Sequence, residues 1–412
     1  MALDLSLYYA TNRNPTDCGG DPVALNQVKA FGTEPYLPRH GYITFGKLTV
    51  KLEESAVQNC LQQSINDMGQ GDGEALAALV KQERIQVTPY VDPLGKTEKT
   101  LDPKEFGSHH FALDLEQEMK QTELGGKGCD LLVYIHGFNV SWEEAVGGAL
   151  ALQLMYNHKR PVAQRGQNPD SDQKIRPSRP IKVILFSWPS NGQMLPFQSY
   201  RSDLQDVNLT DVAFARGFLI LADKLKTRRE ENRDANQTVR LKDRQREDCG
   251  GRVYLLCHSM GNFVLQKTLA KMRSLSKGTA RHPNLFTHAF LCAPDVDADA
   301  LAQGQPLNPL LEVAQEVSVY FNTEDLAMWI SDHTKGNPQR LGQVGTRGLI
   351  EKGIYNIDCS DVVHGVTEHS YYLNGSVAQD ITQTLARWDQ NHKSRSRNKA
   401  SDPGTFVIKP VH

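Results

Sequence analysis

Six short apolar runs, separated by segments with helical spacing, constrain the fold of this chain more than any other feature. The runs are Leu131–Ile135, Ile181–Ser187, Val253–Cys257, His288–Cys292, Val317–Phe321 and Ile354–Ile357. A continuous apolar run is typical of a strand that is covered on both faces. The helical segments lie over about Ser141–Asn157, Asp211–Lys226, Gly261–Arg273 and Val377–Gln390. This alternation predicts an α/β fold with a doubly wound, mostly parallel sheet.

The first part of the chain has a different pattern. Leu5–Thr11 and Tyr42–Leu52 alternate in part between apolar and polar residues, as half-buried strands do. We expect them to be antiparallel strands at the sheet edge. Ala56–Arg84 has helical spacing that is broken near Gly69–Gly73, which we interpret as a loop.

The chain shows no internal repeat and no sharp change of composition over its 412 residues. We therefore predict one domain over 1–412, with N-terminal strands and helices in 1–124 and a catalytic core in 125–392. The charged residues of 393–412 predict a mobile tail. Two polar stretches, 158–180 and 227–250, are expected to be solvated insertions.

Composition narrows the possible partners. Acidic residues number 48 and basic residues 46, which gives no electrostatic case for nucleic acid. No run of about 18 apolar residues predicts a membrane span, and the N-terminus has no signal-peptide pattern. Seven cysteines without a C-x-x-C spacing indicate reduced thiols, two of them (Cys257 and Cys292) in the core, and a cytoplasmic location. The sequence gives no sign of the oligomeric state.

A serine follows the third apolar run at a sharp turn. Cys257-His258-Ser259-Met260-Gly261 matches the pattern G-x-S-x-G except that cysteine replaces the first glycine. A serine between a strand and a helix exposes its hydroxyl above the sheet, close to the first N–H groups of the helix. The pattern indicates a nucleophile, although an ordinary structural turn is the alternative.

The loop after the first apolar run reads His136-Gly137-Phe138-Asn139. Because Gly137 lets the backbone turn inward, the N–H groups of Phe138 and Met260 are expected to form an oxyanion hole. A simple strand-to-helix loop is the alternative. Ser141 and Glu144 have the spacing of a capping box, which predicts a helix start just after this loop.

An activated serine also needs an acid and a base, and the carboxyl ends of parallel strands are where both belong. Asp325 follows the fifth apolar run, and Asp295 follows the fourth. We prefer Asp325, since the aspartates at 295–299 resemble a helix start with carboxylate caps. A calcium loop there is rejected, because Ala300 and Pro306 occupy the positions of the required glycine and glutamate.

The base is expected after the last strand, where His364 and His369 both qualify. We prefer His369, because the adjacent Tyr371 and Tyr372 can pack against it. His258, next to the serine, is interpreted as structural.

Further residues are expected near the substrate. These are His136, Gly137, Asn139, Trp188 and Tyr200, with Asp203 near the entrance. A core tryptophan and surface loop residues are the alternative for positions 188–203. The stretch Tyr8–Arg13 could also reach the site, but no pattern in the sequence places it.

Several stretches together resemble the α/β-hydrolase superfamily, and within it a bacterial branch of largely uncharacterised hydrolases. They are Tyr-Tyr-Ala-Thr-Asn-Arg, Val-Tyr-Ile-His-Gly-Phe-Asn-Val-Ser, Leu-Phe-Ser-Trp-Pro-Ser, Cys-His-Ser-Met-Gly-Asn, Ala-Pro-Asp-Val-Asp and His-Ser-Tyr-Tyr, in this order. The resemblance implies Ser259 as nucleophile, Asp325 as acid and His369 as base. Cys257 and the two polar insertions depart from the family pattern.

These observations predict a serine hydrolase that cleaves a small-molecule carboxylic ester through an acyl-enzyme, without a metal or an organic cofactor. A thioesterase, an amidase or an acyltransferase would use the same three residues. A binding protein that keeps the fold without turnover is the alternative of a different class.

Overall fold

The computed structural model of this protein describes most of the chain. It covers residues 1–16, 28–37, 41–64, 69–91, 102–121, 128–160, 179–190, 196–237, 251–276, 282–325, 339–347, 351–363 and 369–410, with the backbone alone at 103, 120–121, 196–202 and 228–237. The predicted insertion at 158–180 lies largely outside these residues, and His364 lies wholly outside them. Of the predicted insertion at 227–250, residues 227–237 are helical and 238–250 lie outside the described residues.

An eleven-stranded sheet forms the centre of the molecule, with the strand order β12-β13-β11-β10-β9-β8-β6-β7-β1-β4-β5. Its parallel strands are β1 (Ala2–Thr11), β6 (Asp130–Ile135), β7 (Ile181–Ser187), β8 (Val253–His258), β9 (His288–Cys292), β10 (Val317–Phe321), β11 (Ile354–Asp358) and β13 (Thr405–Ile408). β4 (Thr44–Glu53), β5 (Gln86–Tyr90) and β12 (Arg397–Lys399) extend the sheet by antiparallel pairing. The predicted mostly parallel sheet with antiparallel N-terminal strands is confirmed.

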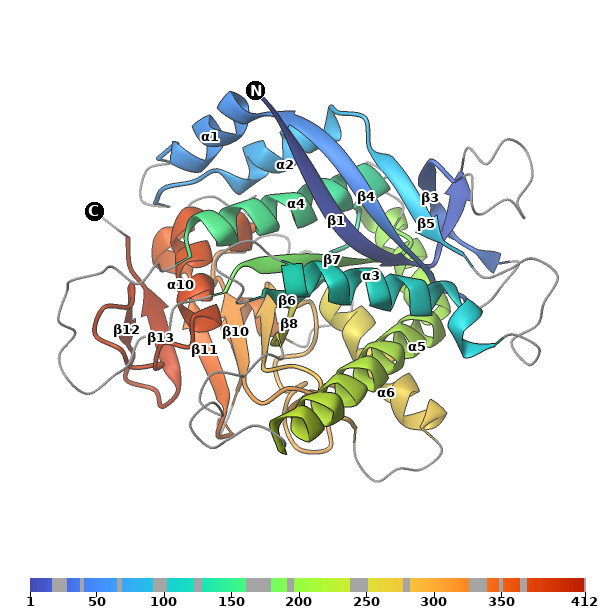
Figure 1. Cartoon of the computed structure of the whole chain (residues 1–412). Coiled ribbons are helices and arrows are strands. Elements are labelled where there is room, and N and C mark those ends of the chain that lie inside the picture. Colours follow the sequence, from blue (N-terminus) through green and yellow to red (C-terminus); the bar gives the residue numbers. More distant parts are fainter. Residues whose placement is uncertain are drawn as a thin grey trace.

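Helices cover both faces of the sheet, and this explains the continuous apolar runs. On one face lie α1 (Glu54–Gln62), α2 (Gly73–Lys81), α4 (Trp142–His158) and α10 (Gly375–Leu385). On the other lie α3 (Gly107–Gln121), α5 (Pro196–Gln237) and α6 (Gly261–Leu275). Successive strand residues point to opposite sides: Leu132 joins the first core and Leu131 the second. Figure 1 shows the two helical layers with the sheet between them.

The N-terminal strand is not at the edge of the sheet. β1 pairs antiparallel with β4, as expected, but its last residues also pair parallel with β7, from Tyr8 opposite Ile184 to Thr11 opposite Ser187 (Figure 1). The edge is β5, a strand that the sequence analysis missed and that contains Pro89. Proline is tolerated at an edge because it donates no hydrogen bond. The carboxyl end of β1 therefore lies beside the carboxyl ends of β6 and β7.

The helices agree with the predicted pattern in most places. The break near Gly69–Gly73 separates α1 from α2, and α5 is longer than the predicted 211–226. Helix α3 was not predicted, although Phe111, Leu115 and Met119 repeat every four residues and are buried against the sheet. A small separate sheet of β2 (Arg13–Thr16) and β3 (Ala30–Pro35) was also not predicted.

The C-terminal residues differ from the expected mobile tail. β13 pairs with β11 and β12 pairs with β13, so the end of the chain completes the sheet. Two of its basic side chains, Arg395 and Arg397, are buried and form ion pairs with the buried Asp380 of α10, at 2.9 and 3.1 Å. A charge-rich composition suggested a solvated tail because the sequence does not reveal the buried carboxylate that pairs with both arginines.

Five cysteines among the described residues are free and buried, including Cys257 and Cys292 in the core as expected. Burial raises the pKa of both thiols well above the ordinary value. Among the helices of the described residues, none has both the length and the apolar character that crossing a membrane requires.

Candidate active site

Ser259 occupies the turn between β8 and α6 with a left-handed backbone, φ +51°. A residue with a side chain rarely adopts this conformation, and such strain is typical of functional turns. Two backbone hydrogen bonds join it to the segment after β9: the Ser259 N–H donates to the Cys292 carbonyl at 3.0 Å, and the Asp295 N–H donates to the Ser259 carbonyl at 3.2 Å. A Cβ atom at Gly261 would lie 2.6 Å from the carbonyl oxygen of His136, so the turn requires glycine there. The strand, turn and helix thus have the arrangement that the motif predicts.

The loop after β6 packs directly against this turn. A Cβ atom added to Gly137 would lie 3.0 Å from the Cβ of Ser259 and 2.9 Å from Nδ1 of His258. Phe138 next to it is half-buried, and Met260 is the N-cap residue of α6. β6 and β8 are neighbours at which the strand order reverses, and this is where open α/β sheets bind their ligands. The capping box of Ser141 and Glu144 that starts α4 is also present as predicted.

Asp325 and His369 meet across the carboxyl ends of β10 and β11. The His369 Nδ1 lies 2.8 Å from Asp325 Oδ2, and the carboxylate is buried. Because a carboxylate accepts, the neutral form of this imidazole carries its proton on Nδ1 and has its free lone pair on Nε2. His369 Nε2 is buried and has no hydrogen-bond partner among the described residues. A nitrogen in this state is suited to accept a proton.

His258 holds His369 from the side of the serine turn. Its Nε2 donates to the His369 carbonyl at 3.1 Å, and its ring lies 4.7 Å, between centroids, from the His369 ring and from the Tyr372 ring. Burial, and then the nearby His369, lowers the pKa of His258 well below the ordinary value, so this ring is neutral at pH 7. The predicted structural role of His258 therefore includes a contact that positions the candidate base.

Asp295, the alternative acid, has a different partner. Its Oδ1 lies 3.5 Å from Nε of Arg340, which also contacts Asp297. Among the described residues, the carboxylate that hydrogen-bonds His369 is that of Asp325. The geometry favours Asp325 over Asp295, while His364 lies outside the described residues.

Two residues that were expected to contact substrate are enclosed by protein. Trp188 has no exposed surface; its ring stacks on His136 at 5.5 Å between centroids, and its Nε1 donates to the His136 carbonyl at 2.9 Å. His136 also has no exposed surface. A side chain without exposed surface cannot line an open pocket, so the prediction of substrate contact is corrected for both. Both side chains pack beside the 137–140 loop. For Trp188 this agrees with the alternative of a core tryptophan.

Asn139 and Asp203, two further residues expected near the substrate, contact each other. Asn139 is exposed with φ +57°, and its N–H donates to Asp203 Oδ2 at 3.1 Å. Ser190 Oγ donates to the same carboxylate oxygen at 2.6 Å and accepts from the Val140 N–H at 3.2 Å. Asp203 is thus buried under the loop and does not line an entrance. Tyr200 belongs to the first turns of α5, where the side chains lie outside the described residues.

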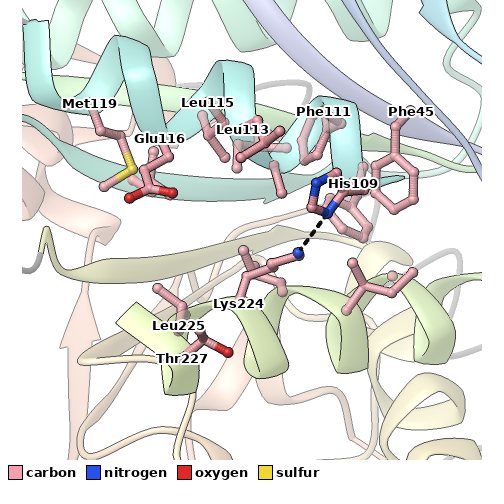
Figure 2. A pocket seen from close by; sticks show the side chains of 17 residues that line it. Phe45, His109, Phe111, Leu113, Leu115, Glu116, Met119, Lys224, Leu225 and Thr227 are labelled. Atoms are coloured by element: carbon pink, nitrogen blue, oxygen red, sulfur yellow. Dashed lines mark hydrogen bonds between the residues drawn. The ribbon is translucent and has the colours of Figure 1, made fainter. Parts of the chain in front are cut away.

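An apolar cavity of about 270 Å³ lies elsewhere, between α3 and α5. Figure 2 shows Phe111 and Leu115 of α3 above it and Leu225 of α5 below, with Lys224 donating to His109 Nδ1 at 3.2 Å. None of the residues that line it is a predicted site residue. It therefore contributes no candidate catalytic group. The described residues also contain no group of three or more His, Cys, Asp or Glu side chains arranged to hold a metal ion.

The doubly wound sheet and the serine at the strand-to-helix turn define the class of this protein, an α/β hydrolase. The family described as "Alpha/beta hydrolase of unknown function (DUF900)" matches residues 114–386, which is more than half of the chain, and the chain belongs to this family. No curated protein matches the chain.

Proposed function

We propose that this hydrolase cleaves carboxylic esters of small molecules through a Ser-His-Asp triad and an acyl-enzyme. One observation carries the proposal: His369 donates Nδ1–H to the buried Asp325 and keeps a free Nε2, while its ring packs on the residue before Ser259. These contacts support the tautomer that a general base next to a serine needs.

The chemistry follows from these roles. Ser259 Oγ attacks the ester carbonyl and transfers its proton to His369 Nε2. Asp325 stabilises the imidazolium that forms, and the N–H groups of Phe138 and Met260 stabilise the oxyanion. His369 then protonates the leaving alcohol, and water releases the acyl group by the same route. A cytoplasmic location, expected from the reduced cysteines, is part of this proposal.

Hydrolysis of p-nitrophenyl butyrate tests the assignment. We expect Ser259→Ala and His369→Ala to abolish turnover. Asp325→Asn should lower kcat by about 10⁴-fold, because the same change in other triads leaves the histidine in the wrong tautomer. Asp295→Asn is the matched control, since this carboxylate contacts Arg340, and it should keep most of the activity. If Asp295→Asn abolishes turnover and Asp325→Asn does not, the acid is Asp295.

A further inference from the structure

Arg13 is a charged side chain buried in the protein, with 1 % of its surface exposed. It follows β1, whose carboxyl end meets those of β6 and β7. The guanidinium group therefore lies at the carboxyl ends of the parallel strands, as Ser259 does.

All five N–H groups of Arg13 have acceptors, and the acceptors come from three segments that are distant in sequence. They are Ser187 Oγ at 2.8 Å from Nε, the Gly32 and Ser190 carbonyls at 3.1 and 3.4 Å from Nη1, and the Val140 carbonyl and His136 Nε2 at 2.7 and 3.4 Å from Nη2. A planar fork with five donors fixes these segments relative to one another.

Two of these contacts hold the loop that packs on Ser259. The Val140 carbonyl is at one end of the 137–140 loop, and His136 is just before its other end. His136 Nδ1 lies 2.8 Å from the Gly137 carbonyl, which can only accept, so Nδ1 carries the proton. The unprotonated Nε2 accepts from the Ser187 hydroxyl at 3.1 Å and faces Arg13 Nη2 at 3.4 Å. Burial, followed by the charge of Arg13, lowers the pKa of His136 well below the ordinary value, which keeps this ring neutral.

The charge of Arg13 has no carboxylate in contact among the described residues. Burial lowers the pKa of Arg13 to about 9, and the nearby Asp203, Glu143 and Asp206 oppose this shift. The guanidinium thus stays charged at pH 7. A buried cation that is satisfied by neutral acceptors is costly, and it acts strongly on any negative charge that forms close to it.

We propose that Arg13 is a positioning residue for the proposed ester hydrolysis. It holds the 137–140 loop against Ser259 through Val140 and His136, and it places a fixed positive charge behind the Phe138 N–H where the oxyanion forms. The inference rests on the proposed function, because it assigns the oxyanion hole to this loop.

Active-site titration with a fluorophosphonate, followed by p-nitrophenyl butyrate kinetics, tests the proposal. We expect Arg13→Met to lower kcat per titrated site by about 10²–10³-fold, as the loss of one oxyanion donor does, with KM within about threefold of wild type. Arg13→Lys keeps the charge but not the planar fork, so its kcat is expected to lie between those of wild type and Arg13→Met. Because titration counts only competent sites, a lower yield of folded protein does not change these values.

Arg397→Met is the matched control, since Arg397 is a buried arginine that contacts Asp380 and not the loop. It is expected to lower the melting temperature and to leave kcat per titrated site unchanged. If wild type is labelled on Ser259 and Arg13→Met keeps kcat within tenfold, the role of Arg13 is overturned and the hydrolase proposal stands. If wild type neither hydrolyses the ester nor reacts with the probe, both proposals fail.

Discussion

Arg13 and the pair Arg395–Arg397 are all buried guanidinium groups, but they contact different kinds of acceptor. Arg395 and Arg397 face Asp380. Burial raises the pKa of this carboxyl, but the two arginines and the Tyr320 hydroxyl outweigh burial and hold the pKa below its usual range. Arg13 faces backbone carbonyls, a hydroxyl and a neutral imidazole.

The difference indicates two uses of the same side chain. The C-terminal cluster pairs its two cations directly with one buried carboxylate and fastens β12 to α10, so we expect it to serve stability. Arg13 has no carboxylate in direct contact among the described residues, and two of its acceptors belong to the loop at Ser259 and the residue before it, so we expect it to serve the reaction. The following predictions test this division, from the largest effect to the smallest.

Asp380→Asn removes the charge that compensates Arg395 and Arg397. Breaking a buried ion pair on one side typically costs about 3–5 kcal/mol, and we expect the free energy of unfolding to fall by this amount. Urea unfolding measures it. The kcat per titrated site should not change, whereas the exposed control Asp402→Asn should change neither quantity. A large fall in kcat per titrated site would remove the distinction between the two clusters.

Gly137→Ala disturbs the loop that Arg13 holds. The added methyl group would lie 3.0 Å from the Cβ of Ser259, so the loop must move away from the serine. A displacement of about 1 Å at a reacting centre can cost about 10²-fold in rate, and we expect kcat to fall by this factor. Gly304→Ala is the comparison, because nothing lies within 4 Å of a Cβ atom there, although its positive φ adds strain. Equal kcat values for the two variants would contradict the predicted closeness of loop and serine.

Asp206 tests the electrostatics around Arg13. Burial, then the charges of Asp203 and Glu34, raises the pKa of this carboxyl from 3.8 to about 7, although Arg13 opposes the shift. Since the folded state keeps the proton up to a higher pH than the unfolded state, stability falls as pH rises from about 4 to about 7 and stays lower above it.

Asp206→Asn should therefore stabilise the protein at pH 8, by about 1–2 kcal/mol after allowance for screening by solvent, with a smaller effect at pH 5. Urea unfolding at the two pH values measures this, and the exposed Asp223→Asn is the control. An equal effect of Asp206→Asn at both pH values would show that the carboxyl does not titrate in this range.

Local patterns were enough to predict the sheet strands of the core and the turn at Ser259. Apolar runs mark doubly covered strands directly, and the serine turn needs only five adjacent residues. The preference for Asp325 came from its place at a strand end, and the structure puts it 2.8 Å from His369. Its role as the acid remains a prediction until it is tested.

Contacts between distant segments could not be predicted in this way. Arg13 reaches Val140 across more than a hundred residues, and Arg397 is neutralised by an aspartate on a separate helix. Neither contact produces a periodic pattern in the sequence. Trp188 was expected in the pocket wall because it follows a strand end. Its stacking on His136, a contact between distant segments, could not be predicted from that position.

Labelling with a fluorophosphonate probe, followed by mass spectrometry of the modified peptide, tests the central claim most directly. The account predicts one adduct on Ser259 in the wild-type protein and none in Ser259→Ala or His369→Ala, with Arg397→Met labelled like wild type. A wild-type protein that does not react, or an adduct on a residue other than Ser259, would contradict it.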